Sequence, residues 1–176
     1  MSFFSRLLGL ESPARCGGEK LYLNILAQSR QRTFYRDGGF ADNYEGRIEV
    51  LTLHMSIFLA HLRNLGENGR GLAQGLFDSM VDDFDIALRE ESLTDTGVSK
   101  RIKPIVRLFY TRAQTYDRAS GQVEELNAVI SAAPESQVSD GFAQSAAAYH
   151  IELTNYVKGL TLGRIANLDF SYPALR

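Results

Sequence analysis

The chain has 176 residues, of which 44% are hydrophobic and 23% are charged. A chain of this length forms one domain, which can bury a core without help from disulfides or a metal. Nineteen lysines and arginines against 21 aspartates and glutamates leave a net charge of −2, which excludes a surface built throughout for nucleic acid. Cys16 is the single cysteine, so an intramolecular disulfide and a multi-cysteine zinc site are also excluded.

The N-terminal segment is amphipathic. One side of a helix over the first ten residues carries only apolar side chains, namely Phe3, Phe4, Leu7, Leu8 and Leu10. This pattern predicts weak, reversible membrane contact, with a frayed or packed terminus as the alternative. No cleavage site for a signal peptide follows, and no apolar stretch reaches the roughly 18 residues of a membrane span. We therefore expect an N-terminal amphipathic or flexible segment, residues 1–17, and a helical domain, residues 18–176.

Apolar residues recur at helical spacing along the chain, without the alternation typical of strands. The sequence therefore predicts an all-α, single-domain bundle of about six helices. The first is expected over residues 18–31, with Leu23, Leu26 and Ala27 facing inward. A loop with two glycines follows at residues 34–40.

The second helix, expected over residues 44–65, is apolar on two sides. The pattern indicates either a central helix or a helix with an exposed binding face, on which Ile57 and Phe58 could line a groove for an apolar partner. The next segment, residues 66–71, contains three glycines and is expected to form a turn. Its glycine spacing fits no dinucleotide or phosphate loop.

Further helices are expected over residues 72–89, 97–116, 121–132 and 136–160. Residues 92–95 have the spacing of a capping box. The apolar stripe keeps its phase across Pro104, which favours a bent helix, with a new helix starting at Pro104 as the alternative. The aromatic C-terminal segment is expected to fold back onto the domain.

The charge reverses in the middle of the chain. Residues 67–95 carry eight acidic and two basic residues, and residues 96–118 carry six basic residues and one acidic residue. Asp78, Asp82 and Asp85 face away from the apolar stripe. Asp83 falls within the stripe and so requires a partner, for which Arg112, Lys100 or a tyrosine hydroxyl is available.

The basic residues predict a ridge on the following helix. Opposite its apolar stripe lie Lys100, Lys103, Arg107 and Arg118. Such a ridge could meet a ribosome, an anionic membrane or an acidic protein, and solvated helix faces with weak ion pairs are the simpler interpretation.

Nothing in the sequence marks a catalytic centre. His54 and His61 share a helix face, but the chain lacks the Glu-x-x-His and His-Glu-x-x-His metal motifs and shows no nucleophile with an orienting base. We expect both histidines to be hydrogen-bonded helix residues. The sequence therefore predicts no enzyme, no cofactor and no metal.

Several motifs together resemble the ubiquinol-cytochrome c chaperone family. They are Leu21-Tyr22 through Ala27-Gln-Ser-Arg30, Phe34-Tyr-Arg-Asp37, Gly46-Arg-Ile with Leu53-His54, Phe77-Asp-Ser-Met-Val-Asp-Asp-Phe-Asp85, Leu88-Arg-Glu90 and Phe109-Tyr-Thr-Arg112. The resemblance covers residues 21–116 well and the remainder weakly. Thr111 replaces an expected glycine, and the segment after Gly121 lacks an Arg-Asn-x-Tyr motif, so the resemblance assigns no client or partner contacts there.

The resemblance implies an all-α assembly factor that binds newly made cytochrome b and promotes its entry into the bc1 complex. Mitochondrial members work with a small partner near the ribosomal exit tunnel. The chain lacks their long targeting extension, so it is similar to a bacterial member that acts in the cytoplasm, peripherally associated with the inner membrane. Residues that match the family's acidic helix and its basic successor are Phe77, Asp78, Met80, Asp83, Asp85, Leu88, Arg89, Glu90, Lys100 and Arg112.

These arguments together predict a binding protein for cytochrome b, with the ribosome or an anionic membrane as further partners and without DNA or a small-molecule substrate. The expected client contacts are Ile57, Phe58, Phe77, Asp78, Asp83, Asp85, Arg89, Lys100, Lys103, Arg107 and Arg112. A helical carrier that shelters a lipid or quinone in an apolar cavity is the alternative.

Overall fold

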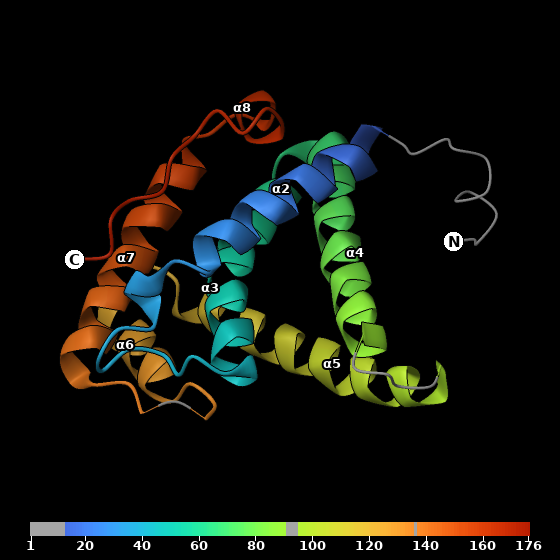
Figure 1. The fold of residues 1–176 in the computed structure, drawn as a ribbon. Helices are drawn as coiled ribbons and strands as arrows, with labels where there is room; N and C mark the ends of the chain where they lie inside the picture. Colours follow the sequence, from blue (N-terminus) through green and yellow to red (C-terminus); the bar gives the residue numbers. More distant parts are fainter. Residues whose placement is uncertain (1–12, 91–94, 136) are drawn as a thin grey trace.

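The computed structural model describes residues 13–90, 95–135 and 137–176, most of which are helical (Figure 1). The α-helices are α2 (Pro13–Ser29), α3 (Tyr44–Arg63), α4 (Gly66–Glu90), α5 (Asp95–Ala119), α6 (Val123–Ser131), α7 (Asp140–Lys158) and α8 (Leu162–Ala166). A 3-10 turn, η1 (Arg32–Phe34), lies between α2 and α3. No strand occurs in the described ranges, so the predicted all-α class is confirmed. The prediction of about six helices omits the short α8.

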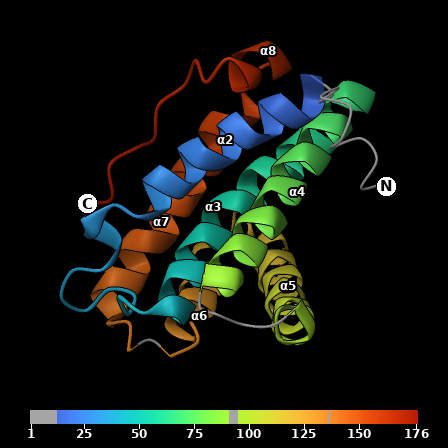
Figure 2. The ribbon, with the colours of Figure 1, turned by 45° about the vertical axis from the view of Figure 1, so that its right-hand side comes forward.

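Helix α3 is the central helix of the bundle. It contacts α2, α4, α5 and α7, and the two ribbon views show it passing between them (Figures 1 and 2). Every residue from position 48 to position 58 is buried. Of the two interpretations of the second helix, the central helix is therefore the correct one. An exposed groove along α3 is not formed, because its two apolar sides pack against different neighbours.

The inward face of α2 differs from the sequence prediction. Leu23 is 54% exposed and Ala27 is also exposed, while Leu21, Tyr22 and Ile25 are buried. These buried residues continue a stripe that starts at Gly18, at helical spacing. A Cβ atom at Gly18 would clash with the α4 backbone, so the absence of a side chain there allows the close approach of α2 and α4. The prediction was wrong for Leu23 and Ala27, because it followed the apolar side chains instead of the glycine, whereas Leu26 is partly buried and packs against the core as predicted.

The connections after α3 also differ in part. The glycine segment is not a separate turn, because α4 already begins at Gly66, whose φ of 74° suits glycine. Helix α5 continues through Pro104, as the constant phase of its apolar stripe predicts. The capping box predicted at residues 92–95 includes residues 92–94, which lie outside the described residues. The C-terminal segment folds back as predicted, with Tyr172 donating a 2.8 Å hydrogen bond to Asn24 of α2.

A buried ion pair joins α3 to α5. Glu49 is 2% exposed and accepts hydrogen bonds from the Arg112 guanidinium and, at 2.6 Å, from the Tyr116 hydroxyl. Arg112 also donates to the Val129 carbonyl at 2.9 Å. Burial, together with the Glu49 charge, raises the pKa of Tyr116, so the phenol stays protonated and donates. The Glu49 carboxylate is therefore paired with a cation and hydrogen-bonded within the core.

Substitution of Glu49 tests this pair. Glu49→Gln keeps the side-chain shape but leaves the Arg112 cation without its counter-charge, so we expect the free energy of unfolding to fall by about 3 kcal/mol. Urea denaturation measures the change. Glu152→Gln, on the exposed side of α7, is the matched control and should change the free energy by less than about 0.5 kcal/mol. Equal midpoints for Glu49→Gln and the control would show that the pair does not stabilise the fold.

Candidate functional site

The surface between α4 and α5 combines apolar and basic side chains. Val81 of α4 and Ile102, Val106 and Tyr110 of α5 line a shallow hollow of about 510 Å³, with Lys103 and Arg107 at its margin. We call this the α4–α5 hollow. Tyr110 is 50% exposed and its ring lies 5.1 Å from that of Phe77, which fixes the ring against α4. An apolar surface is therefore present, but on α5 rather than on α3.

The basic ridge lies beside this hollow. Lys100, Lys103 and Arg107 are exposed, as predicted. A second shallow hollow, lined by Pro104 and Leu108, shares Lys103, Arg107 and Thr111 with the first. The two cations thus lie between two apolar depressions. This arrangement suits a partner that presents apolar side chains next to negative charge or unpaired carbonyl groups.

The acidic residues of α4 have local partners. Asp83 accepts a 2.6 Å hydrogen bond from the Tyr22 hydroxyl of α2, which confirms a tyrosine as the partner predicted for this carboxylate. Burial and then Asp83 raise the pKa of Tyr22, so its hydroxyl remains a donor. Arg15 pairs with Asp82 at 2.8 Å, and Gln74 donates to Asp78 at 2.7 Å. These contacts hold α2 against α4 or stay within α4.

Other residues expected at a partner surface have structural contacts. Asp85 pairs with Arg89 one turn later at 2.6 Å, both at the surface of α4. Arg112, the alternative partner for Asp83, is instead engaged by Glu49. A client contact for these three residues therefore remains a prediction.

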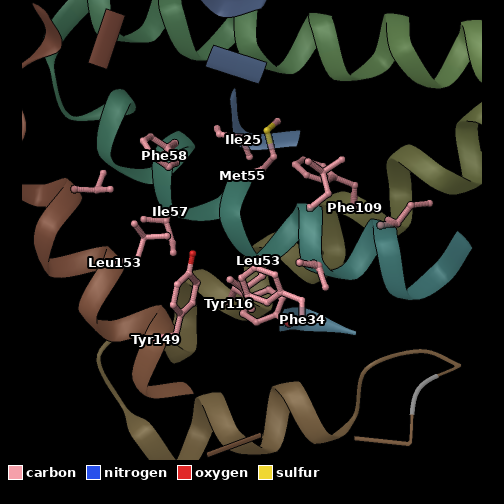
Figure 3. Close-up of a cluster of buried hydrophobic side chains, with 14 of the residues drawn as sticks. Ile25, Phe34, Leu53, Met55, Ile57, Phe58, Phe109, Tyr116, Tyr149 and Leu153 are labelled. Carbon is pink, nitrogen blue, oxygen red and sulfur yellow. The ribbon is translucent and has the colours of Figure 1, made fainter. Parts of the chain in front are cut away.

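Ile57 and Phe58 lie in the core. Their exposures are 5% and 0%, and Figure 3 shows them among side chains from several helices, including Leu153 and Tyr149 of α7. Phe58 also packs on Phe170 of the C-terminal segment, with ring centroids 5.3 Å apart. A charged substitution at either position would disrupt the fold, and it therefore cannot report on client binding. The residues expected in the N-terminal segment, Phe3, Phe4, Leu7 and Leu8, lie outside the described residues.

The histidines of α3 are hydrogen-bonded, as expected. His54 Nδ1 lies 2.8 Å from the Val50 carbonyl, which can only accept, so Nδ1 carries the proton and Nε2 accepts from the Tyr149 hydroxyl at 2.8 Å. His61 Nε2 lies 2.9 Å from the Leu160 carbonyl. Within the part of the chain that the structure describes, no three metal-ligating side chains come together.

A small pocket opens between α3, α5 and α7. Its volume is about 80 Å³, and its lining includes Ile57, His61 and His150. Typical sites for drug-sized ligands measure roughly 300 to 1,000 Å³. The pocket is therefore too small for a lipid or a quinone, and it gives no support to the carrier alternative.

Stability should depend on pH through the two fully buried histidines. Burial lowers the pKa of His54 to about 4, and burial followed by the His54 charge lowers that of His150 to about 4. The unfolded chain, with pKa values near 6.5, binds these protons first as the pH falls, which favours unfolding. Between pH 6.5 and 5, where most carboxylates stay ionised, we expect a loss of about 1.5 kcal/mol per histidine. Urea denaturation across this range measures it, and an unchanged free energy of unfolding would contradict the assignment.

Arginines gather at a further site that sequence reasoning missed. Arg30, Arg32, Arg36 and Arg47 line an open hollow of about 840 Å³, together with Tyr35 and Asp42. We call this the arginine hollow. Residues 30–47 also include Asp37, Asp42 and Glu45, so their net charge is close to neutral and gave no signal. The fold brings the four arginines and Asp42 together, whereas Asp37 and Glu45 do not line the hollow.

The sequence prediction also missed the buried ion pair of Glu49, although the position of this residue in the sequence indicates a buried charge. Glu49 is the one charged residue in the apolar stretch from Ile48 to Phe58. A carboxylate in such a helix requires a cation, and Arg112 beside the apolar stripe of the later helix was available.

Comparisons with known proteins agree with the fold and the motifs. Residues 36–161 match the model of a protein family described as ubiquinol-cytochrome C chaperone. The chain is also similar to the Cbp3 homolog from Brucella abortus, whose crystal structure matches with a TM-score of 0.78 and 29% sequence identity. The match covers 98% of each chain. No curated protein matches the chain.

Proposed function

Because the chain belongs to the ubiquinol-cytochrome C chaperone family, we propose that it binds newly synthesised cytochrome b and promotes its assembly into the ubiquinol-cytochrome c reductase (bc1) complex. The observation that supports a binding role is the α4–α5 hollow, where apolar side chains remain accessible beside two cations. The protein acts as a binding partner and catalyses no reaction.

The hollow has the chemistry that an unassembled membrane protein requires. Helices of such a client expose apolar side chains, which the aliphatic and aromatic wall formed by Val81, Val106 and Tyr110 can cover. Lys103 and Arg107 favour one orientation of the bound client. They attract the C-terminal end of a helix, where carbonyl groups carry partial negative charge, and they repel the Lys- and Arg-rich cytoplasmic loops of membrane proteins.

The proposed place of action is the cytoplasmic face of the inner membrane, with peripheral association. None of the described helices has the length and apolar character needed to cross a bilayer. Lys100 is exposed and does not line the hollow, so it is available to a ribosome or an anionic surface while the hollow holds the client.

Charged substitution in the hollow tests client capture. Tyr110→Asp places a carboxylate in the apolar wall, and because Tyr110 is half-exposed the domain should stay folded. We expect recovery of nascent cytochrome b in a crosslinking pull-down during translation to fall at least about tenfold, the equivalent of losing one central apolar contact. Circular dichroism checks that the helical content is unchanged.

Ile86→Asp is the matched control, because Ile86 lies on α4 outside the hollow and is 53% exposed. It should leave capture within about twofold of the unsubstituted protein. If Tyr110→Asp captures cytochrome b as well as Ile86→Asp does, the hollow is not the client surface. If the unsubstituted protein captures no cytochrome b, the proposed function itself is wrong.

A further inference from the structure

The arginine hollow lies where α2 ends and α3 begins. The connection between these helices is held in place by its own contacts: Phe34 and Phe40 are buried, and the Phe40 amide donates to the Phe34 carbonyl at 3.0 Å. The Ser139 amide, just before α7, donates to the Gly38 carbonyl at 2.8 Å. The arginine side chains therefore extend from an ordered segment of backbone.

The arginines of the hollow differ in the contacts that their side chains make. Arg47 pairs with Asp42 at 2.8 Å, and Arg36 lies 5.7 Å from the Phe142 ring centroid. For Arg30 and Arg32, no side-chain hydrogen bond or ion pair is seen with any residue in the described ranges. Four cations and one carboxylate leave the lining with a charge of about +3. Two exposed guanidinium groups are thus available to an anion.

We propose that the arginine hollow binds the phosphate groups of anionic phospholipids and holds the chaperone at the membrane into which its client is inserted. This inference rests on the proposed function, because a client that assembles in the membrane brings the chaperone to a lipid surface. Guanidinium groups bind phosphate oxygens with two parallel hydrogen bonds, and several of them in one place match a surface of closely spaced phosphates. The cytoplasmic leaflet carries such a surface.

The shape and lining of the hollow favour lipid over RNA. Proteins that bind single-stranded RNA combine a groove along the backbone with exposed aromatic rings on which bases stack. Tyr35 is the single aromatic residue in the lining, and it is half-buried with its hydroxyl bonded to the Ser29 carbonyl at 2.7 Å. The hollow therefore offers charge for phosphates but little surface for bases.

The position of the arginine hollow allows lipid and client to bind at the same time. The two hollows share no lining residue, and Figures 1 and 2 both place the α2–α3 connection on the left of the molecule, apart from the part of α5 that lies beside α4. A chaperone bound to lipid through the arginine hollow would leave the α4–α5 hollow accessible. The membrane and the client would then contact different surfaces.

Vesicle binding by the full chain tests the proposal. The measurement is co-sedimentation with vesicles of phosphatidylcholine alone or of phosphatidylcholine mixed with phosphatidylglycerol, at low and at high salt. We expect binding to the mixed vesicles only, with loss at high salt. In the variant Arg30→Gln with Arg32→Gln, binding should fall by about fivefold for each arginine removed, or roughly 25-fold in total.

The matched control is Arg63→Gln with Arg70→Gln, which removes two exposed arginines outside the hollow and changes the net charge equally. It should bind mixed vesicles within about twofold of the unsubstituted protein. Equal losses in both variants would show that net charge, not the hollow, governs binding and would overturn the proposal. So would hollow-dependent binding of a single-stranded RNA oligonucleotide without vesicle binding.

The vesicle measurement contains no client, so it separates this inference from the proposed function. Hollow-dependent vesicle binding supports the lipid site even if cytochrome b is not captured. Capture of cytochrome b without vesicle binding refutes the lipid site and leaves the proposed function standing.

Discussion

A helix segment that is buried on all sides must satisfy each of its polar groups inside the protein, and residues 48–58 of α3 meet this constraint. Glu49 is paired with Arg112 and Tyr116 of α5, and His54 lies between its own helix backbone and Tyr149 of α7. Thr52 and Ser56 bond to carbonyl groups of α3 itself, whereas Glu49 and His54 each join α3 to one particular neighbour in one register. Apolar packing alone would tolerate small shifts between these helices, whereas an unpaired buried carboxylate would be costly. The positions of α5 and α7 relative to the core therefore depend on these contacts.

The burial of α3 also decides where a partner can bind. Since residues 48–58 of the central helix are buried, the hollow that combines apolar and basic side chains lies at the margin of the bundle, between α4 and α5. Arg112 and Tyr116 hold α5 against α3, while the Phe77 ring of α4 packs against Tyr110 in the hollow. The buried ion pair thereby positions the surface proposed for the client, although it does not itself form part of that surface.

Sequence periodicity predicted the helices, the continuity of α5 across Pro104 and the exposed ridge, because these depend on spacing within one segment. The sequence left three candidate partners for Asp83. Selecting the tyrosine requires knowing that α2 crosses α4 at Tyr22. The exposed apolar surface was assigned to α3 instead of α5 for a related reason. A helix with two apolar sides can be fully buried or half exposed, and only the positions of its neighbours decide which. The arginine hollow depends on a fold of the backbone that local charge counts do not report.

The central claim is that the client contacts the α4–α5 hollow. The most direct measurement introduces a photoreactive amino acid at position 106, within the hollow, or at position 86, outside it, and crosslinks during translation of cytochrome b. Crosslinks to cytochrome b from position 106 and few from position 86 are the result that this account predicts. Equal crosslinking from both positions, or crosslinking from position 86 alone, would contradict it.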